Sequence, residues 1–227
     1  MQKIFSIAID GPAGAGKSTI AKALAKALNA MYLDTGAMYR AVGLYMLRNG
    51  ISVNDAKAVA SHMDAVDISV GYEDGVQRMY LAGEDVSAAI RTPECSMAAS
   101  KVSAVPAVRQ RLVALQRQIA QGHSVVMDGR DIGTYVLPHA TLKIYLTASV
   151  EVRAQRRQAE LAQRGDEQPY EKVLTEMIDR DFTDMNREAS PLRPAEDAHR
   201  VDNSHLTLEQ VIDEIRTMAL EVIEDLK

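Results

Sequence analysis

The sequence predicts a doubly wound α/β fold with a mostly parallel sheet. Short, nearly continuous apolar runs alternate with amphipathic helical patterns, and a glycine-rich turn separates the first run from the first helix. Three of the proposed strands also end in an aspartate that glycine follows within two residues: Asp10, Asp34 and Asp128. Because ligands bind at the carboxyl ends of strands in such sheets, we expect a site at these aspartates.

The first part of the chain shows the alternation clearly. The apolar run at 4–9 predicts a strand buried on both faces, and MYLD at 31–34 predicts a second strand. A helix follows the glycine-rich turn, with apolar side chains on one face, and a second helix covers 37–48. The order of elements is therefore strand, helix, strand, helix.

Residues 61–100 break this alternation. β-prone runs at 67–72 and 76–81 flank Glu73-Asp74-Gly75, which predicts a hairpin. We therefore interpret 61–100 as a small subdomain inserted into a single domain that covers residues 1–227.

The alternation resumes in the second half of the chain. The pattern predicts, in order, a helix from Pro106 to before Gly122, strands at 125–128 and 142–146, a helix from the cap Ser149 to about Arg164, a break at RGDEQP, a helix at 170–187, and a last helix that begins with the capping box Thr207-x-x-Gln210. These elements complete an α/β domain.

Composition narrows the class of protein. A chain of 227 residues with 47% hydrophobic and 25% charged residues is typical of a soluble globular protein with one substantial core. The net charge of −5 argues against a general nucleic-acid binder, and no apolar run reaches the roughly 18 residues of a membrane span. The single cysteine, Cys95, excludes an internal disulfide. We expect a cytoplasmic protein that is a monomer and binds neither nucleic acid nor membranes.

A phosphate-binding loop lies between the first strand and the first helix. GPAGAGKS, from Gly11 to Ser18, matches G-x-x-x-x-G-K-[ST], and the required strand and helix flank it. Glycines let backbone N–H groups turn toward phosphate oxygens, the lysine reaches the β and γ phosphates, and the serine hydroxyl is a ligand for Mg²⁺. The residues predicted to bind the nucleotide are Gly11, Pro12, Ala13, Gly14, Ala15, Gly16, Lys17, Ser18 and Thr19, with Ser18 as the metal ligand.

Two classes of protein carry such a loop: phosphotransferases, and switches or coupled ATPases that act through protein partners. A guanine switch would normally carry an N-K-x-D segment, and none occurs. Arginines favour the transferase, since their planar forks suit phosphate and one triphosphate held by the loop does not need so many. These arginines are Arg40, Arg130, the group Arg153, Arg156 and Arg157, and the pair Arg180 and Arg187, which are expected on one helical face with Asp184.

Five segments together resemble the bacterial cytidylate kinases. They are DGPAGAGKST at 10–19, LDTGAMYRA at 33–41, EDV at 84–86 followed by IR at 90–91, DGRDIGT at 128–134 and RDxxDxNRxxxPL at 180–192. The resemblance covers essentially the whole chain. It implies a Mg²⁺-dependent transfer of the γ-phosphate of ATP to CMP or dCMP. It also implies a five-stranded parallel sheet, an insert that binds the acceptor and a mobile lid, which we place at 150–170.

The resemblance also implies roles for single residues. The acceptor phosphate would be bound by Arg40, Arg130 and Arg187, the ribose by Arg180 and Asp184, and the cytosine by Ser100, Arg109 and Asp131, while Thr35 stands where the family often has serine and Arg153 and Arg157 are the lid arginines. The acceptor is already anionic, so catalysis rests on alignment and charge stabilisation, with Lys17 central.

More specific roles can be predicted for two aspartates, Asp128 and Asp131. Asp128 either contacts Mg²⁺ through a water or braces Lys17 or Arg130, and the residues favour neither reading. Asp131 can accept a hydrogen bond from the cytosine amino group, where uracil has an oxygen instead. The alternative for Asp131 is an ion pair with the adjacent Arg130.

Overall fold

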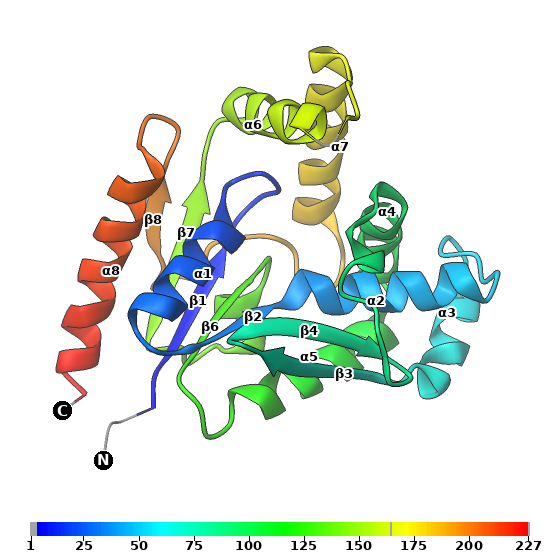
Figure 1. The fold of residues 1–227 in the computed structure, drawn as a ribbon, viewed down its shortest axis with the longest axis horizontal. Coiled ribbons are helices and arrows are strands. Elements are labelled where there is room, and N and C mark those ends of the chain that lie inside the picture. Colours follow the sequence, from blue (N-terminus) through cyan, green and yellow to red (C-terminus); the bar gives the residue numbers. More distant parts are fainter. Residues whose placement is uncertain (1–3, 164, 227) are drawn as a thin grey trace. The chain divides into compact units, whose positions relative to one another are not determined.

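The structure, a computed structural model, describes residues 4–163 and 165–226 in two compact units (Figure 1). The first unit combines Met1–Ala30 with Ser124–Lys227, and the second is the continuous segment Met31–His123. The predicted helix end at Arg164 lies outside the described residues. No helix in 4–163 or 165–226 is long and apolar enough to cross a bilayer.

The parallel sheet has five strands, four of them in the first unit. These are β1 (Ser6–Asp10), β6 (Val125–Gly129), β7 (Leu142–Thr147) and β8 (His199–Asp202), in the order β6-β1-β7-β8. β1 pairs in parallel with β6 from Ser6↔Val125 and with β7 from Ile7↔Leu142. The apolar residues of β1 and β6 are almost completely buried, which explains their continuous apolar runs.

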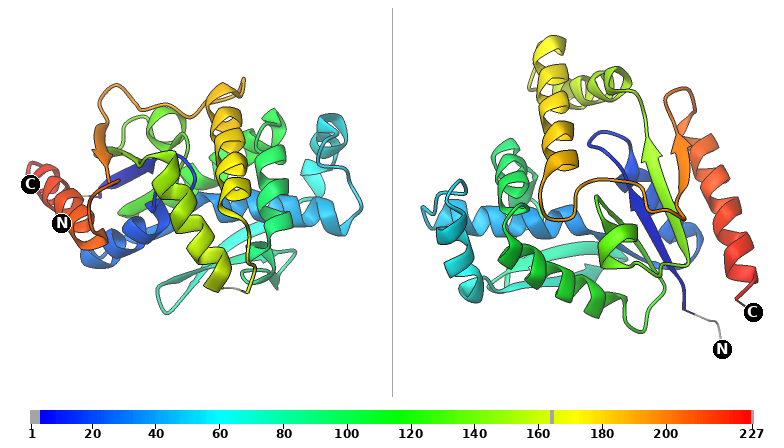
Figure 2. Two further views of the ribbon diagram at one scale, coloured as in Figure 1. Left: turned by 90° about the horizontal axis from the view of Figure 1, so that it is seen from above. Right: turned by 180° about the vertical axis from the view of Figure 1, so that it is seen from behind.

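Four helices complete the first unit: α1 (Lys17–Ala27), α6 (Val150–Gln163), α7 (Tyr170–Asn186) and α8 (Leu208–Glu224). A short π-helical turn, η3 (Ile132–Val136), follows β6. Ala154 and Leu161 of α6 pack against Val173 and Met177 of α7, and Figure 2 shows these two helices side by side. The predicted caps are present, since Ser149 Oγ accepts from Val152 N and Thr207 and Gln210 form the capping box.

The second unit begins with the fifth parallel strand, β2 (Met31–Asp34). Its helices are α2 (Thr35–Arg48), α3 (Ala56–His62), α4 (Pro93–Val102) and α5 (Pro106–Ala120), with 3-10 turns η1 (Met63–Ala65) and η2 (Ala89–Arg91). An antiparallel sheet contains β3 (Ile68–Glu73), β4 (Val76–Leu81) and the short β5 (Glu84–Asp85). The hairpin predicted from the sequence is thus β3–β4.

The predicted fold class is confirmed by the five parallel strands and their helices. Sequence patterns missed β8, because Val201 is its only buried residue and the other three are exposed. They also placed Arg187 in α7, whereas the helix ends at Asn186 and Arg187 has an extended backbone. The limits of the insert, 61–100, and of the lid, 150–170, stay predictions.

Candidate functional site

The phosphate loop joins β1 to α1, and its glycines have the conformations that the motif requires. Gly11, Gly14 and Gly16 all have positive φ, at 152°, 73° and 85°. A Cβ on Gly11 would lie 1.9 Å from the carbonyl oxygen of Leu146, and one on Gly14 would lie 2.7 Å from Cε of Met177. A side chain at Gly11 would therefore displace the loop from β7, while at Gly14 the positive φ is the stronger constraint because the end of Met177 can move.

Three side chains hold carbonyl groups of the loop. Lys17 Nζ donates to Pro12 O at 2.6 Å, Arg153 Nη1 to Ala13 O at 3.0 Å and Asn203 Nδ2 to Ala15 O at 2.8 Å. The N–H and C=O groups of a peptide unit point in opposite directions. Anchored carbonyls therefore leave backbone N–H groups directed to the other side, where a phosphate can bind.

Lys17 is buried, with 6% exposure, and so are several charges around it. Burial lowers the pKa of Lys17 well below its usual value, the nearby Arg130 lowers it further, and Asp128 opposes both. A phosphate brought to this amine would restore its charge, since a neighbouring anion favours the protonated form. The site is therefore suited to an anionic ligand.

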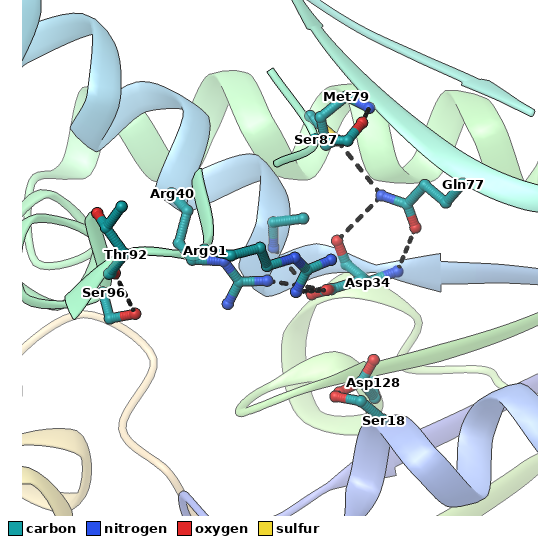
Figure 3. Close-up of polar contacts among 11 residues, drawn as sticks. Ser18, Asp34, Arg40, Gln77, Met79, Ser87, Arg91, Thr92, Ser96 and Asp128 are labelled. Atoms are coloured by element: carbon teal, nitrogen blue, oxygen red, sulfur yellow. Dashed lines mark hydrogen bonds and ion pairs between the residues drawn. The ribbon is translucent and has the colours of Figure 1, made fainter. Parts of the chain in front are cut away.

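Ser18 and Asp128 form the oxygen pair that Mg²⁺ would need. Ser18 Oγ donates to Asp128 Oδ2 at 2.8 Å, so a hydroxyl and a carboxylate oxygen lie side by side (Figure 3). Hard oxygen ligands of this kind fit Mg²⁺, which usually keeps several waters as well. The residues of this chain thus fit the metal that the sequence predicts. When bound, the metal would neutralise negative charge on the transferred phosphate.

The segment after β6 and the end of α7 are joined by two ion pairs. Arg130 Nε contacts Asp184 Oδ2 at 2.8 Å, and Arg187 Nη2 lies 3.7 Å from Asp131 Oδ1. Burial alone would raise the pKa of Asp184, but Arg130 and other nearby arginines outweigh it and lower the pKa. Asp131 therefore lies near Arg187, and its ion pair with Arg130, the alternative from the sequence, stays a prediction.

Asp10, the last residue of β1, holds the segment after β6 by hydrogen bonds. Its two oxygens accept from the backbone N–H groups of Ile132 and Gly133 at 2.8 and 2.7 Å. Burial raises the pKa of Asp10 to about 6, although these two hydrogen bonds act to lower it. The carboxyl group thus fixes the backbone directly after Arg130 and Asp131.

The arginines of α6 have different surroundings. Arg153 is buried, with Nη2 2.7 Å from Asp181 and Nε donating to Ala148 O at 2.9 Å. Arg156 donates to the side chain and backbone oxygens of Asn203, and Arg157 pairs with Glu160 on the exposed face. Arg153 therefore contacts a carbonyl of the phosphate loop directly, whereas Arg156 is connected to the loop only through Asn203.

A second group of polar residues, the Asp34 cluster, lies within the second unit. It consists of Asp34, Arg40, Gln77 and Arg91 (Figure 3). Asp34 Oδ2 accepts from Arg40 at 2.8 Å and from Arg91 at 3.1 Å. The adjacent Thr35 opens α2 and is buried.

The predicted cytosine residues of the second unit lie on two helices. Ser100 is on α4 and half-buried, while Arg109 is on α5 and buried, with its guanidinium carbon 6.0 Å from the centre of the Tyr39 ring. At this distance the ring attracts the guanidinium group through a cation–π interaction.

Sequence reasoning gave no role to Asn203, Gln77 or Arg91. Asn203 follows the strand β8 that the patterns missed, and Gln77 is an ordinary polar position of the hairpin. Arg91 had a signal, because it belongs to the IR pair at 90–91 of the resemblance. Each of the three is joined to its partner by folding rather than by sequence proximity.

Comparison with known proteins identifies the family of this chain. The family model for cytidylate kinase matches residues 7–221. A cytidylate kinase of Caldicellulosiruptor bescii is 51% identical over 225 residues, 99% of each chain, and one of Mycobacterium avium is 53% identical over 213 residues, 93% of each.

Solved structures show the same fold. A gluconokinase from Sinorhizobium meliloti has a TM-score of 0.50 at 16% identity, covering 100% of this chain and 97% of that one. The family model and the cytidylate kinase relatives do not favour a switch or coupled ATPase. With the family model and both relatives in agreement over nearly its full length, the chain belongs to the cytidylate kinase family.

Proposed function

We propose that the protein binds ATP and Mg²⁺ at the phosphate loop and transfers the γ-phosphate to CMP or dCMP. Family membership gives the reaction class, a phosphotransferase with a phosphate group as acceptor. One observation supports the assignment of donor and acceptor: the first unit contains two separate sets of phosphate-binding residues. One set is the phosphate loop with Lys17. The other is Arg130 and Arg187, which lie near carboxylates.

The donor end follows from the loop. Backbone N–H groups of residues 11–16 and the N-terminus of α1 would bind the β and γ phosphates, with Lys17 beside them. Ser18 would bind Mg²⁺ directly. Its hydrogen bond to Asp128 supports the water-mediated metal contact for Asp128, in preference to a brace for Lys17 or Arg130. We assign Gly11 to Thr19 to ATP. Arg153 would support Ala13, and the half-buried Arg157 would exchange its partner Glu160 for a phosphate.

The acceptor end follows from the ion pairs. Carboxylates hold Arg130 and Arg187 in place, and a nucleotide phosphate can replace these carboxylates as the anionic partner of the two arginines. The ribose hydroxyls would then bind to Arg180 and to Asp184, which Arg130 has released. In the second unit Arg40 would bind the same kind of phosphate, Ser100 and Arg109 the base, and Thr35 keeps the hydroxyl that the family places there.

No strong general base is required, because the attacking phosphate oxygen is already anionic near neutral pH. Lys17 and the arginines would stabilise charge on the transferred phosphoryl group and align it. Closure of the lid would exclude water, which otherwise competes as acceptor. The protein's own part of catalysis is thus positioning and electrostatics.

Asp131 would select cytosine over uracil. It is buried, with 5% exposure, so an unfavourable contact with a uracil oxygen would not be relieved by solvent. Such a mismatch costs about 1–3 kcal/mol, or roughly 5- to 150-fold in preference. In Asp131→Asn, the ratio of kcat/KM for CMP to that for UMP should fall toward one. An unchanged ratio would show that another group reads the base.

An ADP-release assay with each nucleoside monophosphate tests the function directly. We expect turnover with CMP and dCMP and little with AMP, GMP or UMP. ATP hydrolysis without dependence on an acceptor would contradict the proposal and favour the coupled ATPase.

Arg130→Ala tests the site. The rate of phosphoryl transfer should fall strongly while the affinity for ATP stays nearly unchanged. An equal loss of both would show that Arg130 binds the donor, ATP.

We also propose that the protein is a monomer and is located in the cytoplasm. Size-exclusion chromatography with light scattering should give a single species near 24.8 kDa. A stable dimer would contradict this part alone.

A further inference from the structure

Asp34 is in contact with three separate segments of the second unit. Its Oδ1 accepts from Ala37 N at 2.8 Å and caps α2. Its Oδ2 accepts from Arg40 of α2 and from Arg91 of η2, which is 57 residues away in the sequence. Gln77 of β4 brackets its backbone, with Oε1 accepting from Asp34 N at 2.6 Å and Nε2 donating to Asp34 O at 3.3 Å.

Helix capping alone does not explain this arrangement. One oxygen of a side chain satisfies the N-terminal N–H groups of α2, and Asn or Ser would cap as well as Asp. The second oxygen is occupied by two guanidinium groups at once, as Figure 3 shows. The carboxylate therefore has a second task, which is to hold two arginines together.

The charges of the Asp34 cluster do not cancel. One carboxylate faces two guanidinium groups, so the cluster keeps one positive charge. Within the part of the chain that the structure describes, the buried Nε of Arg40 has no hydrogen-bond partner. Two arginine forks that share one oxygen, with donors still available, match an anion with several oxygens, as a phosphate has.

We propose that Asp34 is a positioning residue that holds Arg40 and Arg91 as a pair for the acceptor phosphate, and that Gln77 of the β3–β4 hairpin positions Asp34. The proposal rests on the proposed function, in which Arg40 binds that phosphate. It adds Arg91 and gives the hairpin a defined role. The hairpin fixes the orientation of Asp34, and Asp34 fixes the spacing of the two forks.

The electrostatics of Asp34 agree with such a role. Asp34 is only 6% exposed, and burial by itself would raise the pKa of its carboxyl group. Arg40 and Arg91 outweigh burial and lower the pKa, so the carboxylate stays charged at neutral pH. A charged partner holds both arginines more firmly than a neutral one would.

Asp34→Asn is the central test, because asparagine keeps the oxygen that caps α2 and replaces the oxygen that accepts from both arginines by an uncharged NH2 group. We expect KM for CMP to rise roughly 10- to 100-fold, as for the loss of a hydrogen bond to a charged group. KM for ATP should stay within about twofold, and so should the inhibition constant of cytidine, which has no phosphate. A purely structural role would instead lower the melting temperature and weaken both substrates alike, and that result would overturn the proposal.

Gln77→Ala is an independent test of the role of the hairpin, because it leaves Asp34 and both arginines in place. The loss of neutral hydrogen bonds predicts a rise of roughly 2- to 10-fold in KM for CMP. The matched control is Glu84→Gln, which removes the exposed ion pair with Arg48 in the same unit and should change neither KM. Equal KM values for CMP in wild type and Gln77→Ala would remove the hairpin from the proposal.

Arg40→Met separates this inference from the function on which it depends. If Arg40→Met leaves KM for CMP unchanged, the assignment of Arg40 to the acceptor is wrong. If Arg40→Met raises it and Asp34→Asn does not, the function stands and the positioning role of Asp34 is wrong. Both variants are measured with the complete chain in the same assay.

Discussion

Asp10 and Asp34 end the first two strands of the chain, and both are almost completely buried, with 4% and 6% exposure. Their surroundings differ. Asp10 accepts from two backbone N–H groups, while Asp34 accepts from two arginine side chains and one backbone N–H. Burial raises the pKa of Asp10 to about 6, whereas in Asp34 the arginines outweigh burial and lower the pKa.

Burial raises the pKa of both carboxyl groups, so the difference in direction comes from their partners: two backbone N–H groups do not outweigh burial, whereas two arginines do. Asp10 fixes the backbone beside the phosphate loop, in a region where the fold supplies the donors. Asp34 fixes the side chains of Arg40 and Arg91, and for this its carboxylate must stay charged. The four predictions below test this contrast, in order of decreasing effect.

Lys17→Met should have the largest effect. It removes the cation of the phosphate loop, and we expect kcat to fall on the order of 10²- to 10³-fold, as for the loss of one transition-state donor. Because Lys17 lowers the pKa of Asp10, that pKa should also rise above its value near 6. Steady-state kinetics and carboxyl NMR test the two effects. A kcat within tenfold of wild type would contradict the assignment of Lys17.

The pH dependence of stability should distinguish the two aspartates. Asp10 binds its proton more tightly in the folded state, so its stabilising effect is complete below pH 3.8 and is lost as pH rises through about 6. The loss is about 3 kcal/mol in the free energy of unfolding. Asp34 has the opposite sign, since its contribution is present above pH 3.8 and is lost as pH falls through its lower folded pKa.

Chemical unfolding between pH 4 and 7 measures this, with Asp10→Asn as the comparison. The difference in unfolding free energy between wild type and Asp10→Asn should shift against wild type as pH rises. A difference that does not change with pH would show that Asp10 titrates normally.

Asn203→Ala tests whether a neutral side chain can position backbone as Asp10 does. Asn203 links Ala15 O to Arg156, so its loss leaves a buried carbonyl and a guanidinium without their contacts. We expect a loss of roughly 1–3 kcal/mol in stability and a selective rise in KM for ATP. Asn203→Asp is the control, because it retains an acceptor for Arg156 and loses only the donor to Ala15. Unchanged KM for ATP in both would exclude an effect on the loop.

Gln116→Met should have the smallest effect and the opposite direction. Gln116 is 1% exposed, and neither amide atom has a hydrogen-bond partner among the described residues. Replacing this amide by a side chain of similar length removes the cost of burying it, so stability should rise by about 1 kcal/mol. Thermal unfolding measures the change, and activity should be unaltered. A lower melting temperature would mean that the amide is satisfied in solution.

The sequence predicted those parts of the site that are contiguous. The phosphate loop, the strand ends at Asp10, Asp34 and Asp128 and the hairpin could all be read from local patterns. The contacts of Asn203 and Arg91 could not, because their partners lie 188 and 57 residues away. β8 was missed because an edge strand with one buried residue lacks an apolar pattern. The ion pairs of Arg130 and Arg187 likewise depend on tertiary structure.

The division into two units has a consequence for synthesis on the ribosome. The second unit is one continuous segment, so all of its residues have been made before the chain reaches residue 124. β1, by contrast, pairs with β6 and β7, and its first partner, Val125, follows Ser6 by about 120 residues. At about 5–20 residues per second, this strand waits roughly 6–24 s for a neighbour. The phosphate loop, near the beginning of the chain, is thus among the last parts of the protein to acquire its final shape.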